Sequence, residues 1–381
     1  MTSRRIVGDG TIAQLPAVVR DLGARRVLLV CGRRSFEASG ASRVLPALEE
    51  VADVTRWSEF RPNSDAEDLS VGLGVVAESR PDLVVAVGGG TAMDLAKLLV
   101  AYAGSPPHDL AATIRRGEPI TSRRLGLVLV PTTSGSGSEA THFAVVYVGA
   151  DKFSIAGPAL YADAVVLDPQ LSLSGSPYQR ATSGIDAIAQ AIESLWASAA
   201  DDTSRGAARQ ALDLLLPAIV PYVRAPVPDP AVARDMTLGA HLAGRAIDIS
   251  RTTAPHALSY GLTQHHGLPH GHAVGLTLGA CIAVHAVASP EDLVEHVDPR
   301  RHAATMVTIL DLLGAEDAEA AHRRFDELME QVGLAPGLEQ HGVVTAEQRA
   351  ALAQGVNVER LGNNPVAFDT AGLEDLLARC G

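Results

Sequence analysis

Two histidines, His256 and His270, lie fourteen residues apart in the segment HALSYGLTQHHGLPHGHA. Five of the thirteen histidines of the chain fall between residues 256 and 272. Imidazole is the commonest metal ligand and a ready proton carrier near neutral pH, so this density predicts a chemical site. Upstream, GIDAIAQAIESLW places Asp186 and Gln190 four residues apart, on one face of a helix. These four side chains could surround one divalent ion; the alternative is that the histidines cap or pack a helical bundle.

Two loops rich in glycine or hydroxyl side chains follow apolar runs. In VVAVGGGTAMDLAKLL the glycines precede a helix, so backbone N–H groups there can bind a pyrophosphate. In VPTTSGSGSEATHF, hydroxyl side chains follow a second apolar run. Two such loops at strand ends of one sheet favour a bound dinucleotide over a tight turn and a solvated loop. The residues expected to line this site are Gly32, Gly88, Gly89, Gly90, Thr91, Thr132, Thr133 and Ser136.

The residues after the run RVLLVC bear on the choice of cofactor. An acidic residue near the end of such a strand binds the ribose 2′-hydroxyl of NAD, whereas arginine accommodates the 2′-phosphate of NADP. Here Gly32, Arg33, Arg34 and Ser35 follow the strand, with no acid among them. The sequence therefore favours NADPH, with NADH as the alternative.

The first 170 residues alternate short apolar runs with helical periodicity. The runs at 26–31, 82–87, 125–130 and 164–168 read as buried strands of a parallel sheet. Such alternation predicts an α/β, Rossmann-like domain. After residue 169 long amphipathic patterns replace the strands. We expect a nucleotide-binding domain over 1–172 and an all-α, metal- and substrate-binding domain over 173–381.

Composition excludes several classes of protein. At 381 residues, two domains are the default expectation, and a net charge of −13 opposes binding to nucleic acid. A small anionic substrate is not excluded, because a pocket can be locally positive. The scattered Cys31, Cys281 and Cys380 indicate a reducing compartment. The longest low-polarity run is too short to span a bilayer and no secretory signal is visible, so we expect a soluble, cytoplasmic protein with no membrane contact.

At this point the chain resembles the iron-containing, or group III, alcohol dehydrogenases. The resemblance runs through GGGTAMDLAK, PTTSGSGSEAT, KFSIAGPALYADAVVLDP, GIDAIAQAIES and HALSYGLTQHHGLPHGHA. It implies the dehydroquinate synthase-like fold of that family, an α/β nucleotide domain followed by a helical domain. It also implies reduction of an aldehyde by NAD(P)H, an Fe²⁺ or Zn²⁺ ion, and assembly as a homodimer or larger. The positions that match cofactor-contacting residues of the family are Asp94 and Lys152.

The family holds its metal with one Asp and three His. By position these are Asp186, His256 and His270, and the remaining His is replaced here by Gln190. An amide oxygen is a harder and usually weaker donor than imidazole, so metal affinity depends on this departure. A second departure is Tyr260, where many relatives carry another His near the substrate. Tyr260 or His272 is expected to relay the proton to the alkoxide.

QAIESLW, ISRTTAPHALSY, HGHAVGLTLG and ERLGNNP resemble the branch that includes phosphonoacetaldehyde reductases of phosphonate biosynthesis. That branch implies reduction of phosphonoacetaldehyde to 2-hydroxyethylphosphonate. A phosphonate needs cationic or N–H donors, so the candidates for binding it are Arg251, His265, His266, Asn363 and Asn364. The alternative for each of them is a surface or loop-capping role.

Other functions fit the same architecture. Maleylacetate reductases share it, and so do cyclases that use bound NAD without net consumption of NAD(P)H. A metal-free protein that binds nucleotide and regulates a pathway is an alternative from a different class. Gln190 and Tyr260 favour that alternative, whereas Asp186, His256, His270 and the two loops oppose it.

Overall fold

The computed structural model describes residues 3–104, 108–356 and 358–381. Its internal contacts divide the chain into two compact units. The first unit comprises Met1–Gly175 and Val227–His241, and the second comprises Ser176–Pro226 and Leu242–Gly381. Residues 227–241 therefore group with the first unit, although the sequence analysis placed them in the helical domain. The domain boundary near residue 172 stays a prediction.

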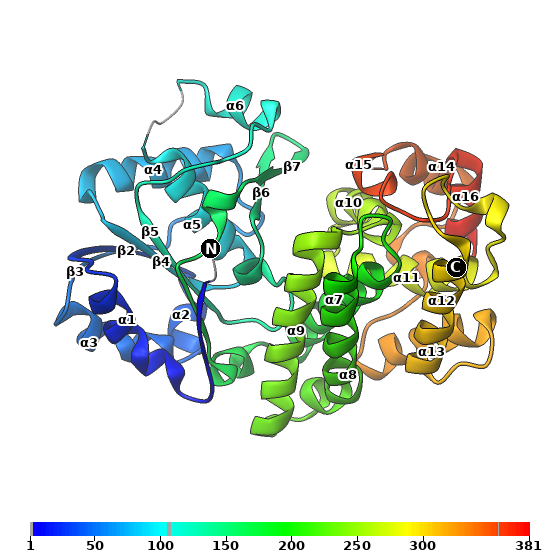
Figure 1. The fold of residues 1–381 in the computed structure, drawn as a ribbon, viewed down its shortest axis with the longest axis horizontal. Helices are drawn as coiled ribbons and strands as arrows, with labels where there is room; N and C mark the ends of the chain where they lie inside the picture. Colours follow the sequence, from blue (N-terminus) through cyan, green and yellow to red (C-terminus); the bar gives the residue numbers. More distant parts are fainter. Residues whose placement is uncertain (1–2, 105–107, 357) are drawn as a thin grey trace. The chain divides into compact units, whose positions relative to one another are not determined.

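Six parallel strands form the sheet of the first unit, in the order β1-β8-β5-β4-β2-β3 (Figure 1). The strands are β1 (Arg4–Val7), β2 (Arg26–Cys31), β3 (Asp53–Trp57), β4 (Leu83–Gly88), β5 (Gly126–Pro131) and β8 (Ala164–Leu167). From β2 the chain moves to β3 on one side, and then returns to β4 on the other side. The carboxyl ends of β2 and β4 thus flank a topological switch point, where open α/β sheets bind ligands.

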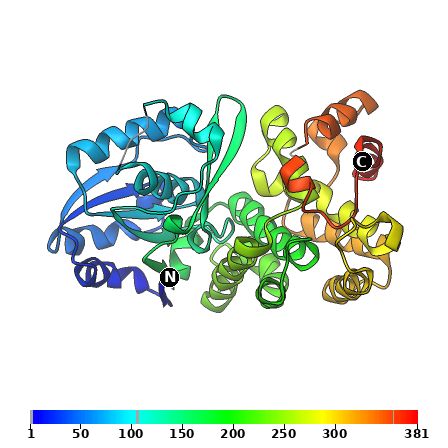
Figure 2. The same cartoon turned by 45° about the horizontal axis from the view of Figure 1, so that its top comes forward.

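Both faces of this sheet are covered, which explains its apolar strands. Leu28 and Val84 belong to one core with α4 and α5, whereas Leu29 and Val85 belong to another core with α1 and α3. Strand side chains alternate between faces, so a strand covered on both sides is apolar throughout. Figures 1 and 2 show the helices on the two faces. They are α1 (Leu15–Asp21), α2 (Ser35–Ala38), α3 (Leu45–Glu49), α4 (Ala66–Ser79) and α5 (Gly90–Tyr102), whereas α6 (Leu110–Arg116) packs against α4 and the hairpin of residues 143–156.

The sequence analysis found β2, β4, β5 and β8 but not the two edge strands or a hairpin. In β1 only Ile6 is buried, and β3 buries only Trp57. An edge strand with one buried residue shows no continuous apolar run. The hairpin pairs β6 (Phe143–Val148) with antiparallel β7 (Asp151–Ala156), and it lies outside the main sheet.

The second unit is helical. It contains α7 (Pro177–Trp196), α8 (Asp202–Arg224), the second half of α9 (Pro230–Ser250), α10 (Ala254–His266), α11 (His270–Val287), α12 (Pro299–Leu313), α13 (Ala318–Gln331), α14 (Ala346–Gln354), α15 (Val358–Leu361) and α16 (Thr370–Ala378). Among the described residues of this unit, the strand-like pairing is a single bridge between Leu293 and Val366. The predicted fold class, an α/β part followed by an all-α part, is confirmed.

Helix α11 runs through the core of the second unit and packs against α7, α10 and α13. It is the one helix in the described part of the chain that is long and apolar enough to cross a membrane. Its neighbours bury 78% of it, as expected of a core helix. At its start, a Cβ on Gly271 would lie 1.9 Å from the carbonyl oxygen of Thr182, so only glycine allows α11 to approach α7 this closely.

Candidate active site

Three side chains from three helices of the second unit converge at one point. They are Asp186 on α7, His256 in the first turn of α10 and His270 at the start of α11. Each offers a ligand atom within 4.8 Å of the others. Nε2 of His256 lies 3.4 Å from Oδ1 of Asp186, and Nε2 of His270 lies 4.0 Å from the same oxygen. The structure therefore brings together residues that are distant in the sequence.

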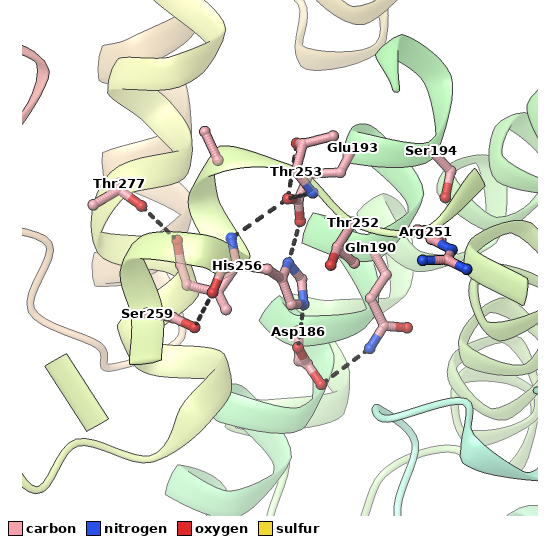
Figure 3. A network of polar contacts seen from close by, with 12 residues as sticks. Asp186, Gln190, Glu193, Ser194, Arg251, Thr252, Thr253, His256, Ser259 and Thr277 are labelled. Carbon is pink, nitrogen blue, oxygen red and sulfur yellow. Dashed lines mark hydrogen bonds and ion pairs between the residues drawn. The ribbon is translucent and has the colours of Figure 1, made fainter. Parts of the chain in front are cut away.

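Gln190 lies one helical turn beyond Asp186 and joins this group. Its Nε2 donates a hydrogen bond of 3.1 Å to Oδ2 of Asp186, and both side chains are buried (Figure 3). The four predicted ligands are thus neighbours in space. One carboxylate, two imidazoles and an amide oxygen make a donor set that suits divalent iron or zinc, so the residues present fit a metal ion.

Glu193, which sequence reasoning missed, supports His256 from behind. Its Oε2 contacts Nδ1 of His256, while its Oε1 accepts hydrogen bonds from the backbone N–H and hydroxyl of Thr253, at 2.8 and 2.9 Å (Figure 3). Its side chain is fully buried. A signal was present, because Asp186, Gln190 and Glu193 follow the four-then-three spacing of one helix face.

Two carboxylates set the charge of His256. Burial by itself lowers the pKa of this imidazole, but Glu193 on one side and Asp186 on the other outweigh burial and raise it to about 10. In the metal-free protein the ring is therefore an imidazolium ion between two carboxylates. A bound cation would replace its Nε2 proton.

His270 is oriented by neighbours on α10. The hydroxyl of Ser259 lies 3.3 Å from its Nδ1, which turns Nε2 towards Asp186. The ring of Tyr260 stacks on the imidazole, with 6.2 Å between ring centroids and an angle of 28°. We refer to the predicted ligands Asp186, Gln190, His256 and His270 as the metal-ligating group. Tyr260 is partly exposed, so its phenol lies beside this group and within reach of solvent.

His272, the other predicted proton carrier, is held differently. Its Nε2 donates to the carbonyl oxygen of Ala335 at 3.0 Å, and its Nδ1 lies 3.2 Å from the hydroxyl of Tyr178. Burial lowers the pKa of His272, so the ring is neutral. Both of its nitrogens are engaged away from the metal-ligating residues, which favours Tyr260 as the proton donor.

The predicted phosphonate-binding residues are not equivalent in the structure. Arg251 is exposed at the end of α9, and its φ of 59° is uncommon for a residue other than glycine. His265 is exposed at the end of α10, and His266 donates from Nδ1 to the carbonyl oxygen of His341. Backbone strain of this kind clusters at functional sites, so Arg251 is the strongest of these candidates.

Asn363 and Asn364 use their amides within the fold. Asn363 donates to the carbonyl oxygens of Ser250 and Thr252, at 2.8 and 3.0 Å. Asn364 is completely buried, and its amide donates to the carbonyl oxygen of Val366 at 2.8 Å. Both side chains tie loop segments together, which favours the alternative, loop-capping role; a phosphonate-binding role for them stays a prediction.

In the first unit, the expected nucleotide-binding residues converge at the switch point. A Cβ on Gly88 would lie 3.9 Å from the backbone nitrogen of Gly32, at the end of β2. A Cβ on Gly90 would lie 3.1 Å from the hydroxyl of Ser136, in the second loop. Helix α5 begins at Gly90 with no side-chain cap, so its first N–H groups remain available to a phosphate. Thr91 lies in the first turn of α5, and Thr132 and Thr133 lie in the second loop.

Asp94 and Lys97 of α5 fix the second loop in place. Asp94 accepts hydrogen bonds from the hydroxyl of Ser138 at 2.6 Å and from the backbone N–H of Val145 at 3.1 Å. Burial raises the pKa of the Asp94 carboxyl group, an effect that Lys97 and more weakly Lys152 oppose. The fully buried Lys97 donates to the carbonyl oxygens of Ser138, Thr141 and Phe143. Sequence reasoning expected Asp94 to contact the cofactor and gave Lys97 no role.

Two further contacts tie the second loop to residues 227–241. The hydroxyls of Ser134 and Thr237 lie 3.0 Å apart. The buried carboxylate of Glu139 lies 3.0 Å from Nδ1 of the buried His241. These contacts explain why the start of α9 groups with the first unit.

Comparisons with known proteins agree with both halves of the chain. The family model for iron-containing alcohol dehydrogenase matches residues 2–169, and that for the C-terminal part of the Fe-containing alcohol dehydrogenase family matches residues 180–380.

A phosphonoacetaldehyde reductase of Streptomyces viridochromogenes is 34% identical over 310 residues, which are 78% of this chain and 76% of that protein. Long-chain-alcohol dehydrogenase 1 of Geobacillus thermodenitrificans is 32% identical over 276 residues, 71% of this chain and 69% of that protein. The crystal structure of a sulfoacetaldehyde reductase from Bifidobacterium kashiwanohense in complex with NAD⁺ superimposes with a TM-score of 0.88 at 25% identity, covering 99% of this chain and 96% of that one.

Proposed function

This chain belongs to the iron-containing alcohol dehydrogenase family and is an oxidoreductase, and from that premise we propose that it reduces phosphonoacetaldehyde to 2-hydroxyethylphosphonate. The observation that carries the proposal is the 34% identity to a phosphonoacetaldehyde reductase over most of both chains. The similarity to a sulfoacetaldehyde reductase points the same way, because both names denote a two-carbon aldehyde with a tetrahedral anionic group.

We assign the metal to Asp186, Gln190, His256 and His270. When bound there, Fe²⁺ or Zn²⁺ supplies Lewis-acid chemistry that polarises the aldehyde carbonyl. Glu193 holds His256 in one orientation, and Ser259 does the same for His270. Because groups behind the ligands fix their orientation, these positioning residues govern metal affinity.

We assign the nicotinamide cofactor to Gly32, to the Gly88–Gly90 loop and to the loop that carries Thr132, Thr133 and Ser136. When bound there, NAD(P)H supplies the hydride. The uncapped start of α5 binds the pyrophosphate, and the exposed Arg33 and Arg34 favour the 2′-phosphate of NADPH. The contacts of Asp94 and Lys97 hold the second loop ready for the cofactor.

Two further side chains act on the substrate in this proposal. Tyr260, stacked on His270, donates a proton to the alcohol oxygen as the aldehyde is reduced. Arg251 binds the phosphonate, which its guanidinium can engage with two parallel hydrogen bonds.

The test is NADPH oxidation by full-length protein loaded anaerobically with Fe²⁺. Phosphonoacetaldehyde is compared with an uncharged short aldehyde, and NADH is compared with NADPH. We expect a kcat/KM at least tenfold higher for the phosphonate and for NADPH. Turnover of the uncharged aldehyde alone would leave the family chemistry intact and remove the phosphonate.

The same assay separates the alternatives. A maleylacetate-reductase-like enzyme would oxidise NAD(P)H with maleylacetate and not with phosphonoacetaldehyde. A cyclase would turn over its substrate with no net consumption of NAD(P)H, and a metal-free regulatory protein would bind no iron. We also propose a cytoplasmic location and a homodimer or larger assembly, the latter measured by light scattering of the purified protein.

A further inference from the structure

A cavity of about 260 Å³ lies between the end of α7, the start of α8 and the start of α12, entirely within the second unit. Its walls include Trp196, Ser198, Arg205, Arg301 and His302. None of these residues belongs to the metal-ligating group. The volume is just below the roughly 300 Å³ at which pockets for drug-sized ligands begin, so it suits a small metabolite and not a dinucleotide.

Two guanidinium groups, those of Arg205 and Arg301, line this cavity in a chain whose net charge is −13. One carboxylate, Asp298, also lines it. Asp298 is engaged, since it accepts a hydrogen bond from the backbone N–H of Arg300 and caps α12. Asp202 is almost fully exposed and lies 4.0 Å from Arg205 and 3.9 Å from Arg301, too far for a hydrogen bond to either.

Arg205 is the most constrained of these cations. Its Nε donates to the carbonyl oxygen of Leu195 at 3.1 Å, whereas its Nη1 is buried and has no hydrogen-bond partner among the described residues. Burial lowers the pKa of this guanidinium and the positive charge of Arg301 lowers it further, while Asp202 and Asp201 oppose the shift more weakly. A buried N–H group without a partner is costly, and an anion in the cavity would remove that cost.

Ser198 and His302 add two further polar atoms. The hydroxyl oxygen of Ser198 is buried and, within the described part of the chain, has no hydrogen-bond partner. The buried His302 donates from Nε2 to the carbonyl oxygen of His285 at 3.0 Å. Burial lowers the pKa of His302, so its ring is neutral and its Nδ1 is an acceptor, which also finds no partner among the described residues.

We propose that this cavity is a second ligand site, which binds a small organic phosphate bearing a hydroxyl group. Arg205, Arg301 and Ser198 donate to the phosphate oxygens, and Nδ1 of His302 accepts a hydrogen bond from the hydroxyl group. Inorganic phosphate supplies the anion but carries no alcohol group to donate to the imidazole. This second site does not depend on which aldehyde the enzyme reduces.

A chain of hydrogen bonds connects the wall of the cavity to the metal-ligating group. Trp196 forms part of the wall, and its indole N–H donates to the hydroxyl of Thr253 at 2.9 Å. Thr253 in turn donates to Glu193, which holds His256. A ligand that shifted Trp196 would therefore act on the residues behind His256.

The experiment is isothermal titration of the full-length protein with glycerol 3-phosphate, inorganic phosphate and glycerol. We expect one glycerol 3-phosphate per chain, inorganic phosphate at least tenfold weaker, and no binding of glycerol. Arg205→Met and Arg301→Met should each weaken glycerol 3-phosphate at least tenfold, since each removes a charge-assisted contact. Arg209→Met is the matched control, because Arg209 lies one turn further along α8 and pairs with Asp213 on the surface.

The variants keep the proposal open to refutation. Arg301 is more than half exposed, so its replacement should not disturb folding, and thermal melting checks each variant. Unchanged binding in both Arg205→Met and Arg301→Met would place the phosphate elsewhere and overturn the site. Equal affinity for inorganic phosphate would overturn the contact between the hydroxyl group and His302. Absence of binding by the wild-type protein would show that the cavity is merely hydrated.

Discussion

The carboxylate of Glu193 contacts Nδ1 of His256, and the opposite nitrogen of the same ring lies 3.4 Å from Asp186. A carboxylate behind a ligating histidine fixes the ring orientation and raises its basicity. Glu193 reaches this position because it lies two turns beyond Asp186 on α7 and is itself held by Thr253. The metal-ligating group is therefore built on one helix face and completed by α10.

Replacing Glu193 with Gln tests that arrangement. The neutral amide cannot raise the basicity of His256 as the carboxylate does, so metal affinity should fall by about 10- to 100-fold. Competition with a chromophoric chelator measures the dissociation constant directly, without an activity assay. Glu327→Gln on the surface of α13 is the control and should leave the affinity unchanged. Unaltered affinity in Glu193→Gln would mean that the carboxylate of Glu193 does not govern metal binding.

Gln190→His would restore the imidazole that the family carries at this position. We expect tighter binding of Fe²⁺ and Zn²⁺, because imidazole is the better donor to these borderline ions than an amide oxygen. The same chelator competition measures the change, with Gln179→His, at the start of α7, as a control for added histidine. If affinity does not rise, the amide of Gln190 serves only to hold Asp186.

Tyr260→Phe and His272→Asn distinguish the two proton carriers. Loss of a general acid typically costs about 10²- to 10⁴-fold in rate. We expect this loss in kcat for Tyr260→Phe, with metal content unchanged. His272→Asn should lower thermal stability, because it disturbs the contacts with Tyr178 and Ala335, and should leave kcat within a few-fold. The opposite pattern would transfer the role to His272.

Arg251→Met examines the anionic end of the substrate. A charge-assisted pair is worth about 1.5–3 kcal/mol, so KM for phosphonoacetaldehyde should rise by about 10- to 100-fold. KM for an uncharged aldehyde should stay the same, because the reacting carbonyl is held elsewhere. An equal rise for both aldehydes would indicate that the strained backbone at residue 251 positions the site as a whole.

The buried thiols predict a loss of stability in alkali. Burial raises the pKa of Cys380 to about 12, from an ordinary value of 9.0. Below pH 9 both folded and unfolded states hold the thiol proton; above it the unfolded state releases the proton first, so stability falls as the pH rises towards 12. The melting temperature of the wild-type protein should therefore drop more steeply between pH 8 and 10.5 than that of Cys380→Ala. Parallel slopes would show that Cys380 ionises freely in the folded state.

The sequence was most informative where a residue type by itself restricts the local structure or chemistry. Strands β2, β4 and β5 are visible because both of their faces are buried, and Asp186 and His256 stand out as candidate ligands because so few residue types bind metals. Glu193 escaped notice because a glutamate on an amphipathic helix is usually solvated. The contacts of Asn363 and Asn364 could not be foreseen, because their partners, such as Ser250 and Val366, are backbone carbonyls that sequence does not distinguish.

Helix α9 belongs in part to each of the two compact units. Its first residues, up to His241, belong to the unit that carries the glycine loops, and the rest belong to the unit that carries the histidines. A gene fragment that ends at residue 175 would thus encode the nucleotide loops but leave the buried Glu139 without His241. An exchange of the cofactor half between two relatives would therefore have to include residues 227–241 as well as the first 175 residues to keep this contact.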